Sequence, residues 1–227
     1  MKKIFSILLA ITFLLGSSIM VSAEENDVGS TLENFEVEVI EGTYTYDFLN
    51  NLDINTLSIE YYGGMLVEDS VHIEIVNKIN EKRFSEVVSI IRQHNLSLVT
   101  KTSTRGVGVR SWDEIIDFQR MSWHILRSLN SGASGEGMTT INGTYSLSLV
   151  TGIVTPIGAP ILNVDVWVGA GITTNISNIS VFYIRLNNNR GLRVSASYNL
   201  TGHSTPFDIP IDIFQHNFGR ISVEHTL

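Results

Sequence analysis

Two side chains of this sequence have the types that a serine hydrolase needs. Ser134 lies in "SGASGEG" (131–137) and His203 lies in "TGHS" (201–204). A hydroxyl nucleophile requires an imidazole base within hydrogen-bond reach and a rigid element that holds both groups. No strand or helix pattern surrounds Ser134, so we interpret it as a flexible serine and His203 as a loop histidine. A hydrolase built on this pair, or on an acid pair such as Asp208 and Asp212, is the least favoured of three hypotheses, and we predict that the protein is not an enzyme.

A histidine and a glutamate two residues apart offer two metal ligands. His72 and Glu74 alternate within "VHIEIV" (71–76), but a catalytic zinc site needs a third protein ligand and the sequence signals none. We interpret both as the polar face of a half-buried strand, opposite Val71, Ile73 and Ile75. No glycine-rich phosphate loop stands between a strand and a helix. The sequence therefore predicts neither a metal nor another cofactor.

Trp167 is the best candidate for a binding residue. In "ILNVDVWV" (161–168) it shares one strand face with Asn163 and Asp165, opposite a row of aliphatic residues. An exposed tryptophan beside amide and carboxylate groups can stack on a sugar or fill a pocket of a partner protein. The alternative is that the strand is covered on both faces and Trp167 is a packing residue, as tryptophans usually are.

The second half of the chain has the pattern of an all-β domain. Alternating segments recur at regular spacing from residue 139 to 227, and "NNNRG" (187–191) supplies a turn. The pattern predicts an antiparallel sandwich or barrel. The expected strands cover residues 144–150, 161–168, 179–186, 192–200, 206–214 and 220–226.

The first half is expected to be a small α+β module over residues 35–129. A hairpin over 57–76, a helix from Asn80 to Asn95, a strand over 96–101 and a second helix over 111–128 give the order β-β-α-β-α. "FEVEVI" (35–40) and "YTYDFL" (44–49) are further possible strands. Residues 24–34 are expected to be a flexible leader, and the Gly/Ser-rich segment 130–138 a linker between the two domains.

The beginning of the chain has the pattern of a secretory signal peptide over residues 1–23. Lys2 and Lys3 precede an apolar run, and Val21-Ser22-Ala23 provides a small-residue cleavage site. Cleavage before Glu24 would change the net charge from −8 to −10, which argues against nucleic acid and anionic lipid as partners. The chain has no cysteine, which excludes disulfides and thiol chemistry. We predict an extracellular protein without a membrane span.

Residues 57–128 resemble the pro-region module of secreted trypsin-like serine proteases of Gram-positive bacteria. The resemblance rests on "EYYGGMLVEDSVHIEIVN", "RFSEVVSIIRQHN", "LSLVT" and "VRSWDEIIDFQRMSWHIL". In that family the pro-region assists folding of the catalytic domain and occupies its substrate cleft. We expect no catalytic domain in this chain, and Ala133 stands where the family's Gly-Asp-Ser-Gly-Gly motif has its acid.

Two hypotheses about function are favoured over a hydrolase. The first is a secreted, non-enzymatic binding protein of a Gram-positive-type bacterium, with an extracellular protein or cell-wall polysaccharide as its partner. The second is an inhibitor or folding aid for a separately encoded secreted serine protease, which the resemblance implies.

Overall fold

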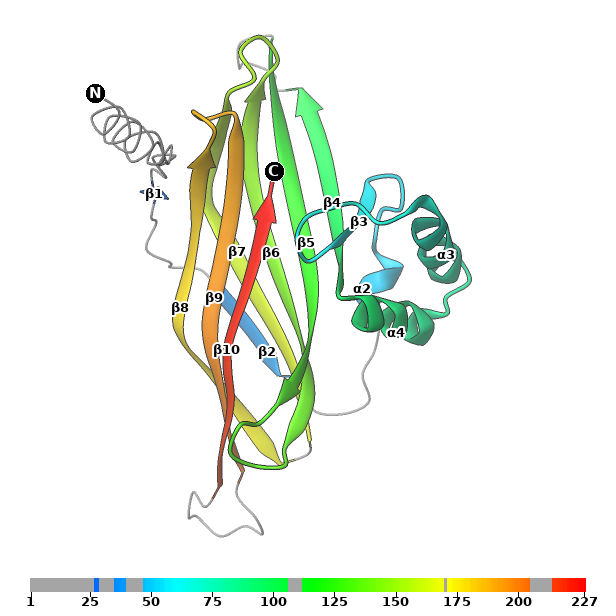
Figure 1. Ribbon diagram of the computed structural model, residues 1–227, viewed down its shortest axis with the longest axis vertical. Helices are drawn as coiled ribbons and strands as arrows, with labels where there is room; N and C mark the ends of the chain where they lie inside the picture. The colour runs from blue at the N-terminus through cyan, green and yellow to red at the C-terminus, as the bar shows by residue number, and fades with distance from the viewer. Residues whose placement is uncertain (1–26, 29–34, 40–46, 106–111, 170, 205–213) are drawn as a thin grey trace, which may run out of the picture.

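The computed structural model describes residues 27–28, 35–39, 47–105, 112–169, 171–204 and 214–227. Its strands are β1 (Asp27–Val28), β2 (Phe35–Val39), β3 (Leu57–Tyr61), β4 (Leu96–Arg105), β5 (Asp113–Arg127), β6 (Ser134–Ser148), β7 (Val154–Val168), β8 (Ile172–Leu186), β9 (Gly191–Ser204) and β10 (Phe214–Thr226), and its helices are α2 (Asp47–Asn50), α3 (Asp69–Asn80) and α4 (Phe84–His94). The described chain is therefore mostly β-structure with two helices of more than one turn (Figure 1).

The strands form two sheets. One has four strands in the order β1-β8-β9-β10, and the other has six in the order β2-β7-β6-β5-β4-β3. All described pairs are antiparallel except β2 with β7. From β5 onward the strands are 13 to 15 residues long, which makes the molecule elongated along the strand direction (Figure 1).

The two sheets face each other across one apolar core. Alternate residues of each strand point inward, as the period of two requires. The row predicted on β7 is Leu162, Val164, Val166 and Val168, of which the first three are buried and Val168 is half-buried. The other sheet contributes Val194, Leu200 and further residues of β8, β9 and β10. The buried residues of this core are Phe118, Leu126, Ile141, Tyr145, Val154, Leu162, Val164, Val166, Val181, Tyr183, Leu192, Val194, Ala196, Tyr198, Leu200, Phe218 and Val223.

A second core lies on the outer face of the six-stranded sheet, where the helices pack. Figure 1 shows α3 and α4 beside β3 and β4, away from the four-stranded sheet. Ile75 of α3 and Val88 and Ile91 of α4 are buried against this face. The sheet contributes Leu96, Leu98, Met121, Trp123 and Met138, with Trp167 partly buried beside them. The helices cover one part of the outer face, and the strands continue beyond them.

The helix predicted over 111–128 is wrong. Residues 113–127 form β5, which pairs along its length with β4 and β6, while Ser111 lies outside the described residues. The inward positions of β5 include Arg120, Ser122 and His124 between apolar residues. These polar residues obscured the period of two, because a buried polar side chain reads as solvent-exposed in a hydropathy pattern.

The second strand of the predicted 57–76 hairpin is also wrong. Residues 69–80 form α3, with Val71, Ile75 and Ile79 recurring every four residues toward the core. The segment "VHIEI" fits a strand, but the longer segment also fits a helix, and packing on the sheet decides between them. The element order from β3 to β5 is therefore β-α-α-β-β in place of β-β-α-β-α.

The helix and strand after α3 are confirmed with a shifted start. Asn80 ends α3, and α4 begins at Phe84. Asn95 ends α4 in the left-handed conformation, with φ 51°, as its side chain type favours. The strand predicted over 96–101 is β4.

The strands predicted over 144–150, 161–168, 179–186, 192–200 and 220–226 all fall largely within described strands. Residues 206–213 lie outside the described residues. Residues 134–138 of the predicted linker belong instead to β6, so the expected boundary falls inside the β5–β6 hairpin. Asp27 and Val28 in the predicted leader pair with β8. The strand predicted over 44–49 is wrong from Asp47 onward, where α2 begins.

No helix of the described segments is long and apolar enough to cross a membrane.

Candidate functional site

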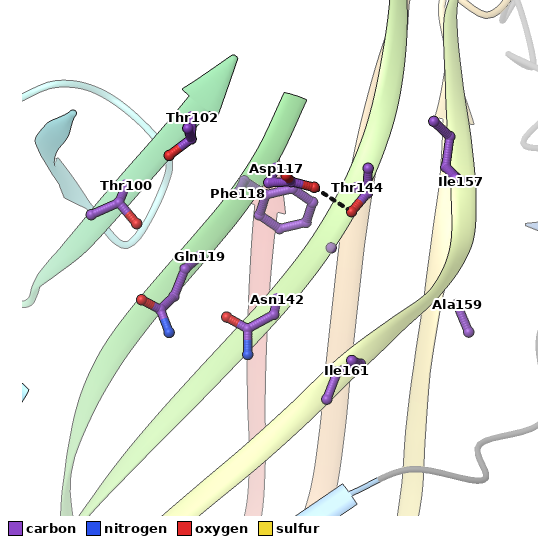
Figure 2. Close-up of a pocket in the computed structure, with 11 residues that line it drawn as sticks. Thr100, Thr102, Asp117, Phe118, Gln119, Asn142, Thr144, Ile157, Ala159 and Ile161 are labelled. Atoms are coloured by element: carbon purple, nitrogen blue, oxygen red, sulfur yellow. Dashed lines mark hydrogen bonds between the residues drawn. The ribbon is translucent and has the colours of Figure 1, made fainter. Parts of the chain in front are cut away.

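A shallow trough lies on the part of the six-stranded sheet's outer face that the helices leave uncovered. Its volume is about 390 Å³, and its lining residues come from β4, β5, β6 and β7 (Figure 2). Three of its lining residues carry hydroxyls, two carry side-chain amides and one carries a carboxylate. The residues are Thr100, Thr102, Asp117, Phe118, Gln119, Asn142, Gly143, Thr144, Ile157, Ala159 and Ile161.

The strand register arranges these side chains as two rungs across the sheet. The first rung is Thr100, Gln119 and Asn142, which are direct cross-strand neighbours on β4, β5 and β6, and Ile161 of β7 continues it. The second rung is Thr102, Asp117, Thr144 and Ile157. Because neighbouring strands are about 4.8 Å apart, each rung presents hydrogen-bonding groups at a regular interval.

Gly143 separates the trough from the core beneath it. A Cβ atom at this position would lie 2.2 Å from the Tyr183 hydroxyl and 2.6 Å from the ring of Phe118. The glycine therefore lets Phe118 pack directly below β6, where its ring lies close to the trough floor (Figure 2). The opposite strand bends at the same level, since the β6–β7 register shifts between Asn142 and Thr144.

The trough offers both polar and apolar contacts. The Thr144 hydroxyl donates a hydrogen bond of 2.6 Å to Asp117 Oδ1, which holds the carboxylate in place (Figure 2). Ile157 and Ile161 are 44% and 43% exposed and form the apolar side. Asp117 is the single ionisable residue among the described residues of the lining. Such a surface can bind a neutral molecule with many hydroxyl groups, and it has no base beside a nucleophile.

The inner face of the same strands holds a buried ionic cluster. Arg120 of β5 donates through Nη1 to Glu60 Oε2 at 2.8 Å and to His225 Nδ1 of β10 at 3.0 Å. All three side chains are at most 6% exposed. Burial acts to raise the pKa of Glu60, but His225 and Arg120 together outweigh it, so the pKa lies below the usual range. Burial and the nearby Arg120 charge lower the pKa of His225.

A second polar chain joins the sheets next to this cluster. His124 Nε2 of β5 lies 2.9 Å from Thr139 Oγ1 of β6, which lies 2.7 Å from the Tyr198 hydroxyl of β9. Burial lowers the pKa of His124 to about 4 and raises that of Tyr198. These groups are neutral at pH 7. His124 is thus half-buried, and this polar chain, like the ionic cluster, joins the two sheets.

The predicted binding residues lie at the edge of the helical layer. Trp167 stacks on Trp123, with ring centroids 5.4 Å apart and planes 6° apart, and it packs against the second core. One face of its ring is therefore occupied by Trp123. Asp165 is half-buried two residues away on the same face of β7. Asn163 is half-buried two residues beyond Ile161, so it adjoins the trough.

The other chemical candidates lie on separate elements. Ser134 is exposed at the start of β6, opposite Arg127, and His203 lies on β9 in the other sheet. His72 and Glu74 lie on α3, where residues two apart point to different sides. His72 Nε2 contacts the Leu57 carbonyl at 3.4 Å. Asp208 and Asp212 lie outside the described residues.

A different histidine lies between two serines. His216 of β10 contacts Ser131 Oγ through Nδ1 at 2.7 Å and Ser204 Oγ through Nε2 at 2.9 Å. Both ring nitrogens are engaged by hydroxyls, and none of the described ion pairs joins His216 to a carboxylate. The contacts tie the β5–β6 turn to β9 and β10.

The two rungs were not predicted from the sequence. Thr100 and Thr102 on β4 alternate with Val99 and Lys101, a visible strand pattern. Asp117 and Gln119 on β5 were instead assigned to a helix, so their alignment with β4 and β6 was not found. The signal was present in the spacing, but recognising it required the correct element type.

No protein-family model, curated protein or solved structure matches this chain.

Proposed function

We propose that this protein is a secreted, non-enzymatic binding protein of a Gram-positive-type bacterium, in which the two facing sheets form a β-sandwich and the trough binds a polysaccharide of the cell wall. The observation that carries the proposal is the pair of rungs on the outer face. They place three threonines, a glutamine, an asparagine and an aspartate beside aliphatic side chains.

This combination suits a sugar polymer. A sugar presents hydroxyl groups around its rim and C–H groups on its ring faces, so it needs polar partners and an apolar contact together. Gln119 and Asn142 each offer a donor and an acceptor, while Ile157 and Ile161 offer exposed apolar surface. Each rung has polar side chains on β4, β5 and β6 and an isoleucine on β7. Because the trough is open, a polysaccharide chain bound in it can extend beyond it.

The experiment is a titration of the purified protein with soluble cell-wall polysaccharide, followed by calorimetry. We expect Gln119→Ala with Asn142→Ala to weaken binding at least about tenfold, since the substitutions remove two side-chain amides that would hydrogen-bond the sugar in the complex. Asn199→Ala, on the outer face of the four-stranded sheet, is the matched control and should bind normally. The proposal fails when wild-type protein shows no binding, or when the control loses as much affinity as the double variant.

A separately encoded secreted serine protease is the alternative partner. It is supported by the resemblance of residues 57–128 and by the helix α4 and strand β4, which have the element types that the resemblance implies. The strand β5 counts against it, because that segment should be helical. Inhibition of a secreted protease by the purified protein, unaffected by Gln119→Ala, would favour this alternative over polysaccharide binding.

A further inference from the structure

One end of the molecule exposes four large apolar side chains. Trp112 precedes β5 and is 64% exposed, and the β6–β7 turn contributes Leu149, Val150 and Ile153 at 57%, 71% and 40%. This turn projects at the top of the molecule, beyond most of the strand ends (Figure 1). We call Trp112, Leu149, Val150 and Ile153 the apolar tip. Contiguous exposed apolar side chains mark sites of contact with a protein or a membrane.

Backbone hydrogen bonds hold the apolar tip in a fixed shape. Leu149 N–H donates to the Trp112 carbonyl at 2.9 Å, which joins the two segments. Within the turn, Ser148 N–H donates to the Ile153 carbonyl at 2.9 Å and Gly152 N–H donates to the Ser148 carbonyl at 2.8 Å. Gly152 has φ +69°, which a glycine adopts without strain. The apolar side chains are therefore displayed by a closed turn.

A polar hollow adjoins the apolar tip. It has a volume of about 670 Å³ and is lined by Thr151, Ile153, Asn187, Asn188 and Arg190. The β8–β9 turn is joined to the apolar tip by a 2.7 Å hydrogen bond from Val154 N–H to the Asn189 carbonyl. Arg190 is exposed there. A guanidinium and two side-chain amides beside apolar residues can accept a phosphate whose attached chains are apolar.

The size of the apolar tip favours a lipid surface over a protein. Its four side chains expose on the order of 400 Å², which is half of the roughly 800 Å² that each partner contributes to a standard protein interface. A projecting turn also suits a bilayer better than a flat protein surface, since lipids rearrange around it. Tryptophan is enriched at the membrane–water interface because its ring is apolar and its N–H is polar.

The charge of the protein indicates which lipid. The net charge is −8, and Arg190 is the single basic residue among those described around the hollow. An anionic bilayer would repel the protein as a whole, whereas a zwitterionic one would not. We propose that the apolar tip docks on a zwitterionic phospholipid surface, with the headgroup phosphate in the hollow beside Arg190. This inference is independent of the polysaccharide trough, which lies on different residues.

The experiment uses the full chain with vesicles of brominated phosphatidylcholine, whose bromine atoms quench tryptophan emission on contact. The chain has three tryptophans, of which Trp123 is 5% exposed and Trp167 stacks on it. Quenching is therefore expected to come from Trp112 and to disappear in Trp112→Phe. The apolar segment 4–15 is present in every variant, so binding through it alone would not depend on the apolar tip.

Leu149→Asp with Val150→Asp is expected to raise the vesicle concentration needed for half-maximal quenching at least tenfold, because both carboxylates would have to enter the membrane interface. Leu129→Asp is the matched control. Leu129 is 75% exposed at the β5–β6 end, away from the apolar tip, and its substitution should leave quenching unchanged. All three substitutions alter exposed positions, and circular dichroism is used to check that the variants are folded.

Three results would overturn the inference. The first is an absence of Trp112 quenching in the wild-type protein, and the second is an equal loss in Leu129→Asp. The third is a blue shift of Trp112 emission that grows with protein concentration without vesicles, which would identify a second copy of the chain as the occupant.

Discussion

The outer face of the six-stranded sheet has two parts, built from the same strands, that differ in what covers them. Under α3 and α4, the residues pointing outward are large and apolar, such as Leu98 on β4 and Trp123 on β5. Further along the same strands, they are Thr100 and Gln119. The transition occurs within two residues on both strands, from Leu98 to Thr100 on β4 and from Met121 to Gln119 on β5, and both parts share one continuous hydrogen-bonded register.

The comparison shows that the backbone pairing of the strands does not depend on which layer covers their outward side chains. Backbone hydrogen bonds join β4, β5 and β6 equally in both parts, so the change of side chains reports the neighbouring layer. On a sheet face that no helix covers, polar side chains disfavour association with a second sheet. In this protein they also form two rungs of hydrogen-bonding groups.

Leu98→Ala tests this comparison with the largest expected effect. Leu98 is 2% exposed under α4, and its truncation should reduce the free energy of unfolding by about 2–5 kcal/mol. Thr100→Ala, on the same strand and face, is the control and should change it by less than about 0.5 kcal/mol. Urea unfolding monitored by tryptophan fluorescence measures both. Comparable losses in the two variants would show that the trough is as covered as the helical part.

Acid tests a second difference, between the open polar trough and the buried polar groups on the inner face. A histidine in the unfolded chain has a pKa near 6.5, whereas burial lowers the pKa of His124 to about 4. Between those values the unfolded chain binds more protons, so the free energy of unfolding falls as pH drops. The loss from this group should approach roughly 3 kcal/mol at pH 4.

Two neighbours act in the same direction as His124. The pKa of His225 is also lowered by burial, and the lowered pKa of Glu60 adds a further loss as the pH falls below its ordinary value. His124→Gln should flatten the slope between pH 6.5 and pH 4, while Gln119→Ala in the trough should leave it unchanged. Urea midpoints at pH 7.5, 5.5 and 4.5 measure the slopes. An identical slope in His124→Gln would contradict the assignment.

How much of this could be predicted from the sequence differs between the two halves of the chain. Where inward positions are continuously apolar, as in "ILNVDVWV" on β7, the period of two predicted the strand correctly. On β5 the inward positions Arg120, Ser122 and His124 are polar, and their partners come from β3, β4 and β6. Such partners are distant in sequence, so the pattern failed where polar groups are buried. The trough was not predicted for the same reason: two of its six polar residues, Asp117 and Gln119, lie on β5, and the other four lie on the strands beside it.

Gly143→Ala tests how the trough floor depends on the core below it. A Cβ atom would lie within 2.6 Å of both Tyr183 and Phe118, whose positions are fixed by the two sheets. The ring or the hydroxyl must shift, and we expect the free energy of unfolding to fall by about 1–3 kcal/mol. Gly132→Ala, at a position with open space around it, is the control and should have little effect. An unchanged unfolding midpoint in Gly143→Ala would show that the core has room that the structure does not indicate.

The smallest expected effect on stability is in the trough, where a substitution should change affinity for polysaccharide without changing stability. Gln119→Ala combined with Asn142→Ala removes two amide side chains that face solvent and for which no hydrogen bond is described within the residues that the structure covers. The free energy of unfolding should change by less than about 0.5 kcal/mol, because nothing packed is lost. The affinity for polysaccharide should nevertheless fall at least about tenfold, since on binding those amides would have exchanged water for sugar hydroxyls. Thermal unfolding and calorimetry on the same samples separate the two effects. A variant that loses stability and affinity together would mean that the rungs hold the sheet and do not form a separate binding surface.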